Sequence, residues 1–462
     1  MDARSSSWRY LLHPQIRLLP VYIPMGLYPF LSSDIYPDGD TVIKIGKSSL
    51  CIDGHAHNDV LRSAVILNPN RSDWDYVRRR GFKFIRTYGV FPNIRDARWY
   101  IPLDNPLVTF RAWDIYKPFA LKGKVYKWVC RSLSLAKLSK HFGDTLLIAQ
   151  DEVPILTEIA SKYVEIDPAK HFITLSSGTP GPSRKVTACL TDGAGYPIAF
   201  VKLGDTGRAI ASLQHEFDMM NYVGCRGYES FEIPFVLGYE AGEAFTYIIT
   251  RPIGNLRPSG YTLLPLHINF LKETYESSAG QYLVDDLVYE LASRHDDIRD
   301  SLPQEFNAAL AESIVYIEDA ILQKGIHTQL SHGDFAPWNV YLTPKRLVLL
   351  DWESGKISQF PLADAFHFVM QVDLLVKNMS GESSAARSLA EGQRVAKLIG
   401  ADLSYRQIVG LYMAYLVDVI LRWFEDRSGQ DSYPLDALQR GRLQALLAAS
   451  RVYNDARSGI TR

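Results

Sequence analysis

Apolar residues recur with two different periods along the chain, and the period changes near Leu263. Before that point, short apolar runs of strand length are separated by turn residues, a pattern typical of antiparallel strands. The turn at 192–195, Asp-Gly-Ala-Gly, has the composition that closes hairpins. We expect a small antiparallel sheet with one helix, from about Ala209 to Val223, after its third strand. The expected strands are 171–175, 185–191, 197–203, 235–239 and 245–250.

After Leu263 the apolar spacing becomes helical. Two short strands, 339–342 and 347–350, interrupt the helices around a turn at 343–346, and helices resume from 363 to about 454. One expected helix carries an apolar face and ends before Gly325. That face consists of Phe306, Leu310, Ile314, Ile317 and Ile321.

Residues 1–150 follow neither period clearly, since they are rich in proline, aromatic residues and arginine. Strands at 41–45 and 83–88 and a helix from Val125 to His141 are plausible, and a helix at 152–163 links this part to the next. We therefore predict an α+β protein of three parts. They are an N-terminal α+β module of unknown function (1–150), a small sheet lobe (151–255) and a helical lobe (256–462).

Charge is balanced overall but uneven along the chain. The net charge of the 462 residues is −1, so no nucleic-acid partner is expected. Residues 1–150 hold 22 Lys+Arg and 12 Asp+Glu, which gives +10, and the remaining 28 and 39 give −11. The basic module could make peripheral contact with an anionic membrane or glycan. A solvated basic face that docks on the acidic half is the interpretation we favour, because the basic residues are scattered.

Cysteine content and apolar stretches favour a cytoplasmic protein without an integral membrane segment. The four cysteines show no C-x-x-C spacing, and so few in a long chain fit a reducing compartment. The apolar stretch 18–31 is short and contains three prolines. The stretch 408–421 contains Asp418 and has the length of a buried core helix.

The strongest chemical signal is the sequence from Ser331 to Asn339, Ser-His-Gly-Asp-Phe-Ala-Pro-Trp-Asn, followed by an apolar strand that ends at Asp351. Phosphoryl transfer needs an acceptor hydroxyl held in line and a phosphate charge neutralised by metal and cations. Asp334 is suited to orient the hydroxyl. Asn339 and Asp351 offer the hard oxygen ligands that Mg²⁺ prefers.

This spacing resembles the aminoglycoside phosphotransferase and choline kinase-like family, whose catalytic loop reads H-G-D-x-x-x-x-N with a metal-binding Asp one hairpin later. The resemblance implies a bilobal protein kinase-like fold, with Asp334 as the catalytic base and Asn339 and Asp351 as Mg²⁺ ligands. His332 would support the loop. Gly333 stands where protein kinases have arginine, which favours a small-molecule kinase over a regulated protein kinase.

Upstream residues extend the resemblance to an ATP site. Ala199-Phe200-Val201-Lys202 resembles the strand whose lysine contacts phosphates, and Glu216 could form the ion pair that positions Lys202. The loop 176–183 stands where kinases cover phosphates, although it lacks G-x-G-x-x-G. The segment 248–254 would be the hinge that binds adenine. Further cofactor-binding candidates are Ser177, Gly178, Thr179, Thr250 and Ile253, and Asp364 is assigned a structural role at a helix start.

The expected activity is transfer of the γ-phosphoryl group of ATP, with Mg²⁺, to a hydroxyl of a small molecule. Aminoglycosides, choline, sugars and amino-alcohols are the acceptors that the resemblance implies. The alternative is a non-catalytic scaffold that works through its basic N-terminal module. The sequence His55-Ala56-His57 resembles the metal pair of amidohydrolases, but that chemistry needs further ligands on a longer barrel.

Overall fold

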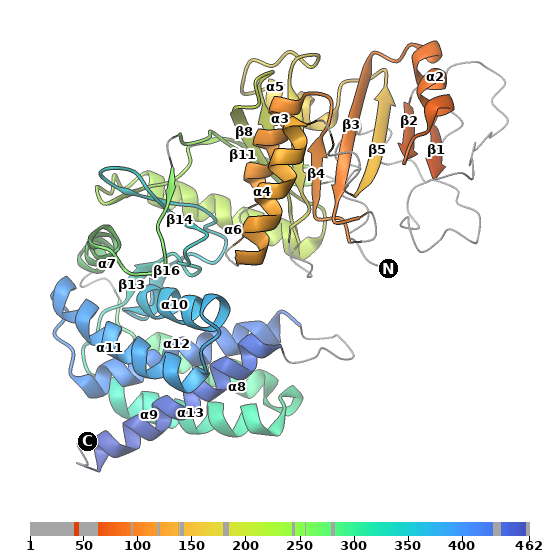
Figure 1. Cartoon of the computed structure of the whole chain (residues 1–462). Helices are drawn as coiled ribbons and strands as arrows, with labels where there is room; N and C mark the ends of the chain where they lie inside the picture. The colour runs from red at the N-terminus through yellow and green to blue at the C-terminus, as the bar shows by residue number, and fades with distance from the viewer. Residues whose placement is uncertain are drawn as a thin grey trace. The chain divides into compact units, whose positions relative to one another are not determined.

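The computed structural model describes residues 41–45, 63–93, 96–116, 118, 121–136, 138, 143–178, 184–242, 245–254, 256–278, 282–427 and 436–458. The chain forms two compact units (Figure 1). Unit 1 comprises Met1–Leu213 and Phe235–Pro252, and unit 2 comprises Gln214–Pro234 and Ile253–Arg462.

Unit 1 is built on a sheet of ten described strands, in the order β1-β2-β5-β3-β4-β6-β7-β8-β11-β10. Neighbouring strands pair antiparallel except for β1 and β2. The strands are β1 (Thr41–Ile45), β2 (Ser63–Leu67), β3 (Phe84–Phe91), β4 (Trp99–Pro102), β5 (Asp144–Gln150), β6 (Phe172–Ser176), β7 (Val186–Thr191), β8 (Pro197–Gly204), β10 (Val236–Ala241) and β11 (Thr246–Thr250). The helices are α2 (Arg71–Arg80), α3 (Pro106–Ala112), α4 (Leu121–Leu135), α5 (Ile155–Ser161) and the first part of α6 (Gly207–Gly224).

The predicted boundary at residue 150 falls inside this sheet, at the carboxyl end of β5. Strand β4 pairs with β6, with Trp99 opposite Ser176 and Tyr100 opposite Leu175. Side chains from both sides of the boundary, such as Val90 and Val201, share one hydrophobic core. The described N-terminal strands and the predicted small sheet are therefore one continuous structure.

Alternating burial explains why the strands of the small sheet could be predicted from the sequence. In β8, Ala199, Val201 and Leu203 are buried, whereas Phe200 and Lys202 lie on the other face and are only partly buried. Strands β6, β7, β8, β10 and β11 and helix α6 match the predicted ranges within two residues. The helix predicted from Val125 to His141 begins four residues earlier and ends at Leu135.

Unit 2 is mainly helical, and the α+β class is confirmed. Its helices are the second part of α6, α7 (Pro265–Ser278), α8 (Asp285–Ile298), α9 (Gln304–Ile321), α10 (Ala363–Gln371), α11 (Gly381–Ile399), α12 (Tyr405–Glu425) and α13 (Ala437–Arg457). Its short strands are β9 (Phe231–Glu232), β12 (Arg257–Pro258), β13 (Gln329–Ser331), β14 (Val340–Leu342), β15 (Leu347–Leu349) and β16 (Lys356–Gln359).

Helix α12 forms the centre of this unit and contacts α8, α9, α11 and α13 (Figure 1). Among the described residues, it is the one helix long and apolar enough to cross a membrane, and 83% of its most apolar window is buried inside the protein. The prediction of a buried core helix around Asp418 is therefore confirmed.

Candidate active site

A short hairpin brings two predicted site residues together. Strands β14 and β15 pair with Val340 opposite Leu349, so Asn339 and Leu350 flank the open end. The Leu350 N–H donates to the Asn339 carbonyl at 3.0 Å. Asp351 follows directly and therefore emerges beside Asn339. Its φ of +71° lies in the left-handed region, a strained backbone of the kind found at functional sites.

Asp334 is held against the same hairpin end. The Asn339 Nδ2 donates to Asp334 Oδ2 at 2.8 Å and to the Asp334 carbonyl at 3.1 Å. Because the amide nitrogen is directed at Asp334, the amide oxygen points elsewhere and can serve as a metal ligand. Asp334, Asn339 and Asp351 thus come together as predicted for the catalytic loop and its metal-binding partner.

The Asp334 carboxyl is held in its ionised form. Burial by itself would raise its pKa, and so does the charge of nearby Asp351. The hydrogen bond and charge of His367, with a smaller effect of His332, outweigh both and leave the pKa of Asp334 below its usual value. A carboxylate of lowered pKa is better suited to orient a hydroxyl than to hold its proton.

His332 and Gly333 shape the loop. The His332 Nε2–H donates to the Leu350 carbonyl at 2.9 Å, and its Nδ1 accepts from the Asp334 N–H at 3.3 Å. This ring therefore ties the catalytic loop to the hairpin. Gly333 has a φ of +75°, and a Cβ there would lie 1.9 Å from the Ser354 carbonyl oxygen. No arginine of the protein kinase type can occupy this position.

Asp364, at the start of α10, holds the catalytic loop in place through three hydrogen bonds. Its Oδ1 accepts from the Ser331 hydroxyl at 2.9 Å and from the Gly333 N–H at 3.0 Å. Its Oδ2 accepts from the His332 N–H at 2.8 Å. Because all three bonds are made to the loop that precedes Asp334, the role of Asp364 is structural, as expected.

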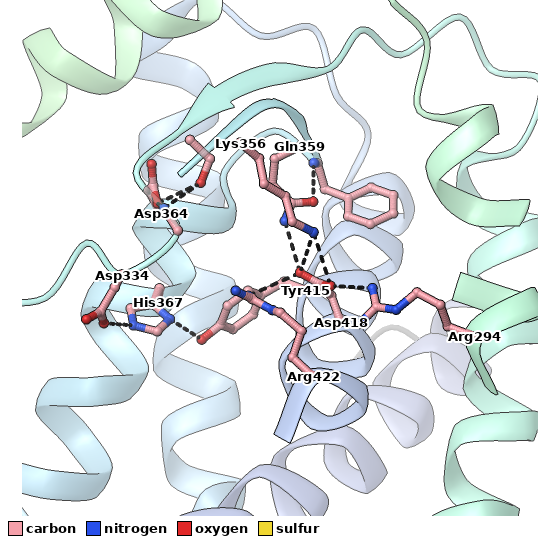
Figure 2. A network of polar contacts seen from close by, with 12 residues as sticks. Arg294, Asp334, Lys356, Gln359, Asp364, His367, Tyr415, Asp418 and Arg422 are labelled. Atoms are coloured by element: carbon pink, nitrogen blue, oxygen red, sulfur yellow. Dashed lines mark hydrogen bonds and ion pairs between the residues drawn. The ribbon is translucent and has the colours of Figure 1, made fainter. Parts of the chain in front are cut away.

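The structure adds a residue that the sequence reasoning missed. Figure 2 shows His367 between Asp334 and Tyr415. The His367 Nε2–H donates to Asp334 Oδ1 at 2.9 Å, and the Tyr415 hydroxyl lies 3.1 Å from the His367 Nδ1, within hydrogen-bond distance. A signal was available, because His367 follows Asp364 by three residues and so lies on the same helical face.

On the other side of Tyr415, Asp418 anchors α12 to the strand that precedes α10 (Figure 2). Its Oδ2 accepts from Gln359 on β16 at 3.0 Å, and Lys356 on the same strand lies 3.4 Å from Oδ1. Strand β16 pairs with β13, which leads into the catalytic loop. Helix α12 therefore supports the site twice, through Tyr415 and through Asp418.

The predicted phosphate-binding pair lies in different units. Lys202 stands on β8 of unit 1, opposite Thr187 and Ile248. Glu216 is buried on the part of α6 that belongs to unit 2. The Lys202–Glu216 ion pair stays a prediction.

The loop between β6 and β7 is only partly described. The buried Ser177 donates its hydroxyl to the Ala97 carbonyl at 2.7 Å and its N–H to the Arg98 carbonyl at 2.9 Å. Ser177 could donate a hydrogen bond to phosphate only if one of these two bonds were broken. Gly178 has a φ of +68°, and Thr179 lies outside the described residues.

The predicted hinge coincides with the passage between the units. Thr250 ends β11, and Ile253 is the first residue of unit 2 in this segment. Both are partly buried. Their contact with adenine stays a prediction, and the histidine pair at 55 and 57 lies outside the described residues.

The described residues contain no group of three or more His, Cys, Asp or Glu placed to hold a metal ion. The expected set of one carboxylate, one amide oxygen and substrate phosphates is of a different kind. Asn339 and Asp351 at one hairpin end fit such a set.

The chain is similar to solved structures of aminoglycoside phosphotransferases. An apo thermostable mutant of APH(4)-Ia is 17% identical, with 60% of this chain and 94% of that chain covered and a TM-score of 0.44. ADP-bound APH(2'')-Ib is 15% identical, with 64% and 97% covered and a TM-score of 0.41. The streptomycin–ATP complex of APH(2'')-IIa is 15% identical, with 64% and 97% covered and a TM-score of 0.42. No protein-family model matches the chain, and no curated protein matches it.

Proposed function

We propose that the protein is an ATP-dependent phosphotransferase that moves the γ-phosphoryl group to a hydroxyl of a small molecule. The observation that carries this proposal is the convergence of Asp334, Asn339 and Asp351 at one hairpin end. In-line phosphoryl transfer requires a group that orients the acceptor hydroxyl and ligands for the metal ion that neutralises phosphate charge, and these three residues can supply both.

Asp334 orients the acceptor hydroxyl. In a loose transition state the hydroxyl loses its proton late, so a carboxylate of lowered pKa can hold the O–H in line without first removing the proton. His367 occupies Oδ1 of this carboxylate and Asn339 occupies Oδ2, which fixes the plane of the group. His367 is thus a positioning residue.

Asn339 and Asp351 would hold Mg²⁺. The bound ion would neutralise charge on the phosphate oxygens. We assign Lys202 to the ATP phosphates, Glu216 to positioning Lys202, and 248–254 to adenine, on the resemblance of their motifs. The acceptor classes are those that the resemblance implies, namely aminoglycosides, choline, sugars and amino-alcohols.

ADP release over a panel of such acceptors tests the proposal, with Asp334→Asn as the matched variant. We expect turnover on at least one acceptor and a loss of about 10²–10⁴-fold in kcat for Asp334→Asn. Failure to bind ATP with Mg²⁺ would contradict the proposal. ATP binding without turnover on any acceptor would favour the scaffold alternative.

A further inference from the structure

Helix α4 buries only a narrow part of its surface. Its inward side carries the buried Cys130 and Ser134, and Cys130 packs with Phe91, Ile101 and Trp113. The Ser134 hydroxyl donates to the Cys130 carbonyl. The Tyr126 ring also packs edge-on against Trp113, with the ring centroids 6.2 Å apart. The buried face of α4 is therefore narrow, although an amphipathic helix normally turns most of its large apolar residues inward.

The large apolar side chains of α4 face solvent. Val125, Trp128, Val129 and Leu135 follow the spacing of one helical stripe. Trp128 is 69% exposed, Leu135 55% and Val125 54%. Of the eighteen large hydrophobic side chains exposed among the described residues, six lie between 125 and 138. Such a concentration of exposed apolar side chains is typical of a surface that binds a membrane or another protein.

Two lysines stand at an electrostatically unfavourable end of the same helix. Lys122 and Lys124 are exposed in its first turn, and no acidic residue accompanies them there. The helix macrodipole disfavours positive charge at this end. Lys127 and Arg131, one turn further on, are held by Asp114 at 3.0 and 2.8 Å.

The surrounding sequence is strongly basic. Between 111 and 140 there are eight Lys+Arg and one Asp+Glu, a net charge of 8 − 1 = +7. Helix α4 lies beside α3 in Figure 1, and the Arg131 guanidinium covers the Phe110 ring of α3 at 4.0 Å. The contacts of Lys127 and Arg131 with Asp114 and Phe110 hold one side of α4 in place. The apolar stripe and the two first-turn lysines are exposed.

We propose that α4 is a membrane-surface helix that binds anionic lipid bilayers. An exposed stripe containing Trp, flanked by lysines, is the composition of helices that lie in the headgroup region. A glycan would match the lysines but leave Trp128, Val129 and Leu135 in water. A second copy of this chain would bring two equally basic surfaces together, and their charges would repel.

Sedimentation of the full-length protein with lipid vesicles tests this surface. One set of vesicles is phosphatidylcholine alone, and the other contains phosphatidylglycerol. We expect binding to the second set only, weakened by added salt. Lys122→Glu with Lys124→Glu should weaken it by roughly fivefold or more per charge. Trp128→Ser with Val129→Ser should weaken it by about tenfold or more.

Matched controls lie elsewhere on the surface. Val315→Ser, at a side chain 59% exposed on α9, and Lys324→Glu with Lys345→Glu should leave vesicle binding unchanged. The proposal is overturned by equal binding to both vesicle sets, by no binding to either, or by heparin binding without vesicle binding. A dimer that dissociates with Trp128→Ser would also overturn it. None of these outcomes depends on ATP turnover, so the phosphotransferase proposal is tested separately.

Discussion

Two aspartates of unit 2 are equally inaccessible to water and differ in the direction of their pKa shifts. The side chains of Asp418 on α12 and Asp373 on the π-helical turn Val372–Val376 are 2% and 0% exposed. Burial raises the pKa of both. For Asp418, the charges of Arg422, Lys356 and Arg294 outweigh burial and lower the pKa far below its usual value. For Asp373, burial prevails over Arg387 and raises the pKa to about 6.

The two sites differ in the number of cations around the carboxyl and in how many of its oxygen atoms are hydrogen-bonded. Asp418 Oδ1 accepts from Arg294 at 2.8 Å, and Oδ2 is shared by Gln359 and Arg422. Asp373 uses Oδ1 for Arg387 at 2.7 Å and for Lys377 at 3.2 Å, whereas its buried Oδ2 has no hydrogen-bond partner among the described residues. The pKa of a buried carboxyl therefore depends on the cations and hydrogen bonds around it as well as on burial.

Asp418→Asn should produce the largest effect, a loss of about 3–5 kcal/mol in the free energy of unfolding at pH 7, because it removes the buried anion that Arg294, Lys356 and Arg422 share. Since the pKa is lowered in the folded state, this contribution is present above pH about 4 and disappears as the pH falls further. Urea unfolding at several pH values measures it. Asp296→Asn, on an exposed side chain, is the control, and equal stability of Asp418→Asn and wild type at pH 7 would contradict the comparison.

His367→Gln extends the comparison to a third carboxylate, Asp334, whose charge also depends on a partner. We expect kcat to fall about 10–100-fold, as for other groups that orient a catalytic residue. The KM for ATP should stay unchanged, because His367 does not contact the predicted nucleotide residues. Steady-state kinetics separate the two constants, and an effect confined to KM would count against the positioning role.

Asp373→Asn should have the opposite sign to Asp418→Asn. A raised pKa means that ionisation destabilises the folded state, so wild type loses stability as the pH rises from about 4 to about 6. The variant should then be more stable by about 2–3 kcal/mol above pH 6 and nearly equal to wild type at pH 4. Thermal unfolding at the two pH values measures this, and destabilisation at pH 7 would show that the ion pair with Arg387 dominates.

Arg387→Gln should give the smallest effect. The arginine side chain is 35% exposed, so its ion pair with Asp373 is screened and worth less than about 1 kcal/mol. Its removal should raise the pKa of Asp373 further and move the pH-dependent loss of stability upward. If Arg387→Gln destabilised the protein as much as Asp418→Asn does, the proposed difference between the two aspartate sites would be wrong.

Local features were predictable from sequence. The hairpin that carries Asn339 and Asp351 has strands with all-apolar sequences and a four-residue turn, and its pairing follows from that turn alone. The strands on either side of 192–195 and the helix α9 are equally local, because their periodicity records which face is buried.

Features set by distant contacts were not predictable. The pairing of β4 with β6 joins residues about 75 positions apart, and no periodicity of apolar residues in the sequence indicates it. His367 acts through Asp334, 33 residues earlier, so its role depends on how α10 is placed. Helix α4 has the stripe of a buried helix, and only the structure shows that Val125, Trp128 and Leu135 in that stripe are exposed.

The pairing of β4 with β6 also has a practical consequence. A protein shortened to begin after β5 would present the backbone N–H and C=O groups of β6 along an open side, ready to recruit strands from other molecules. It would also lose about a third of the buried residues of the shared hydrophobic core. Expression of residues 151–462 by themselves is therefore expected to yield aggregated material, because the preceding strands normally cover the edge of β6.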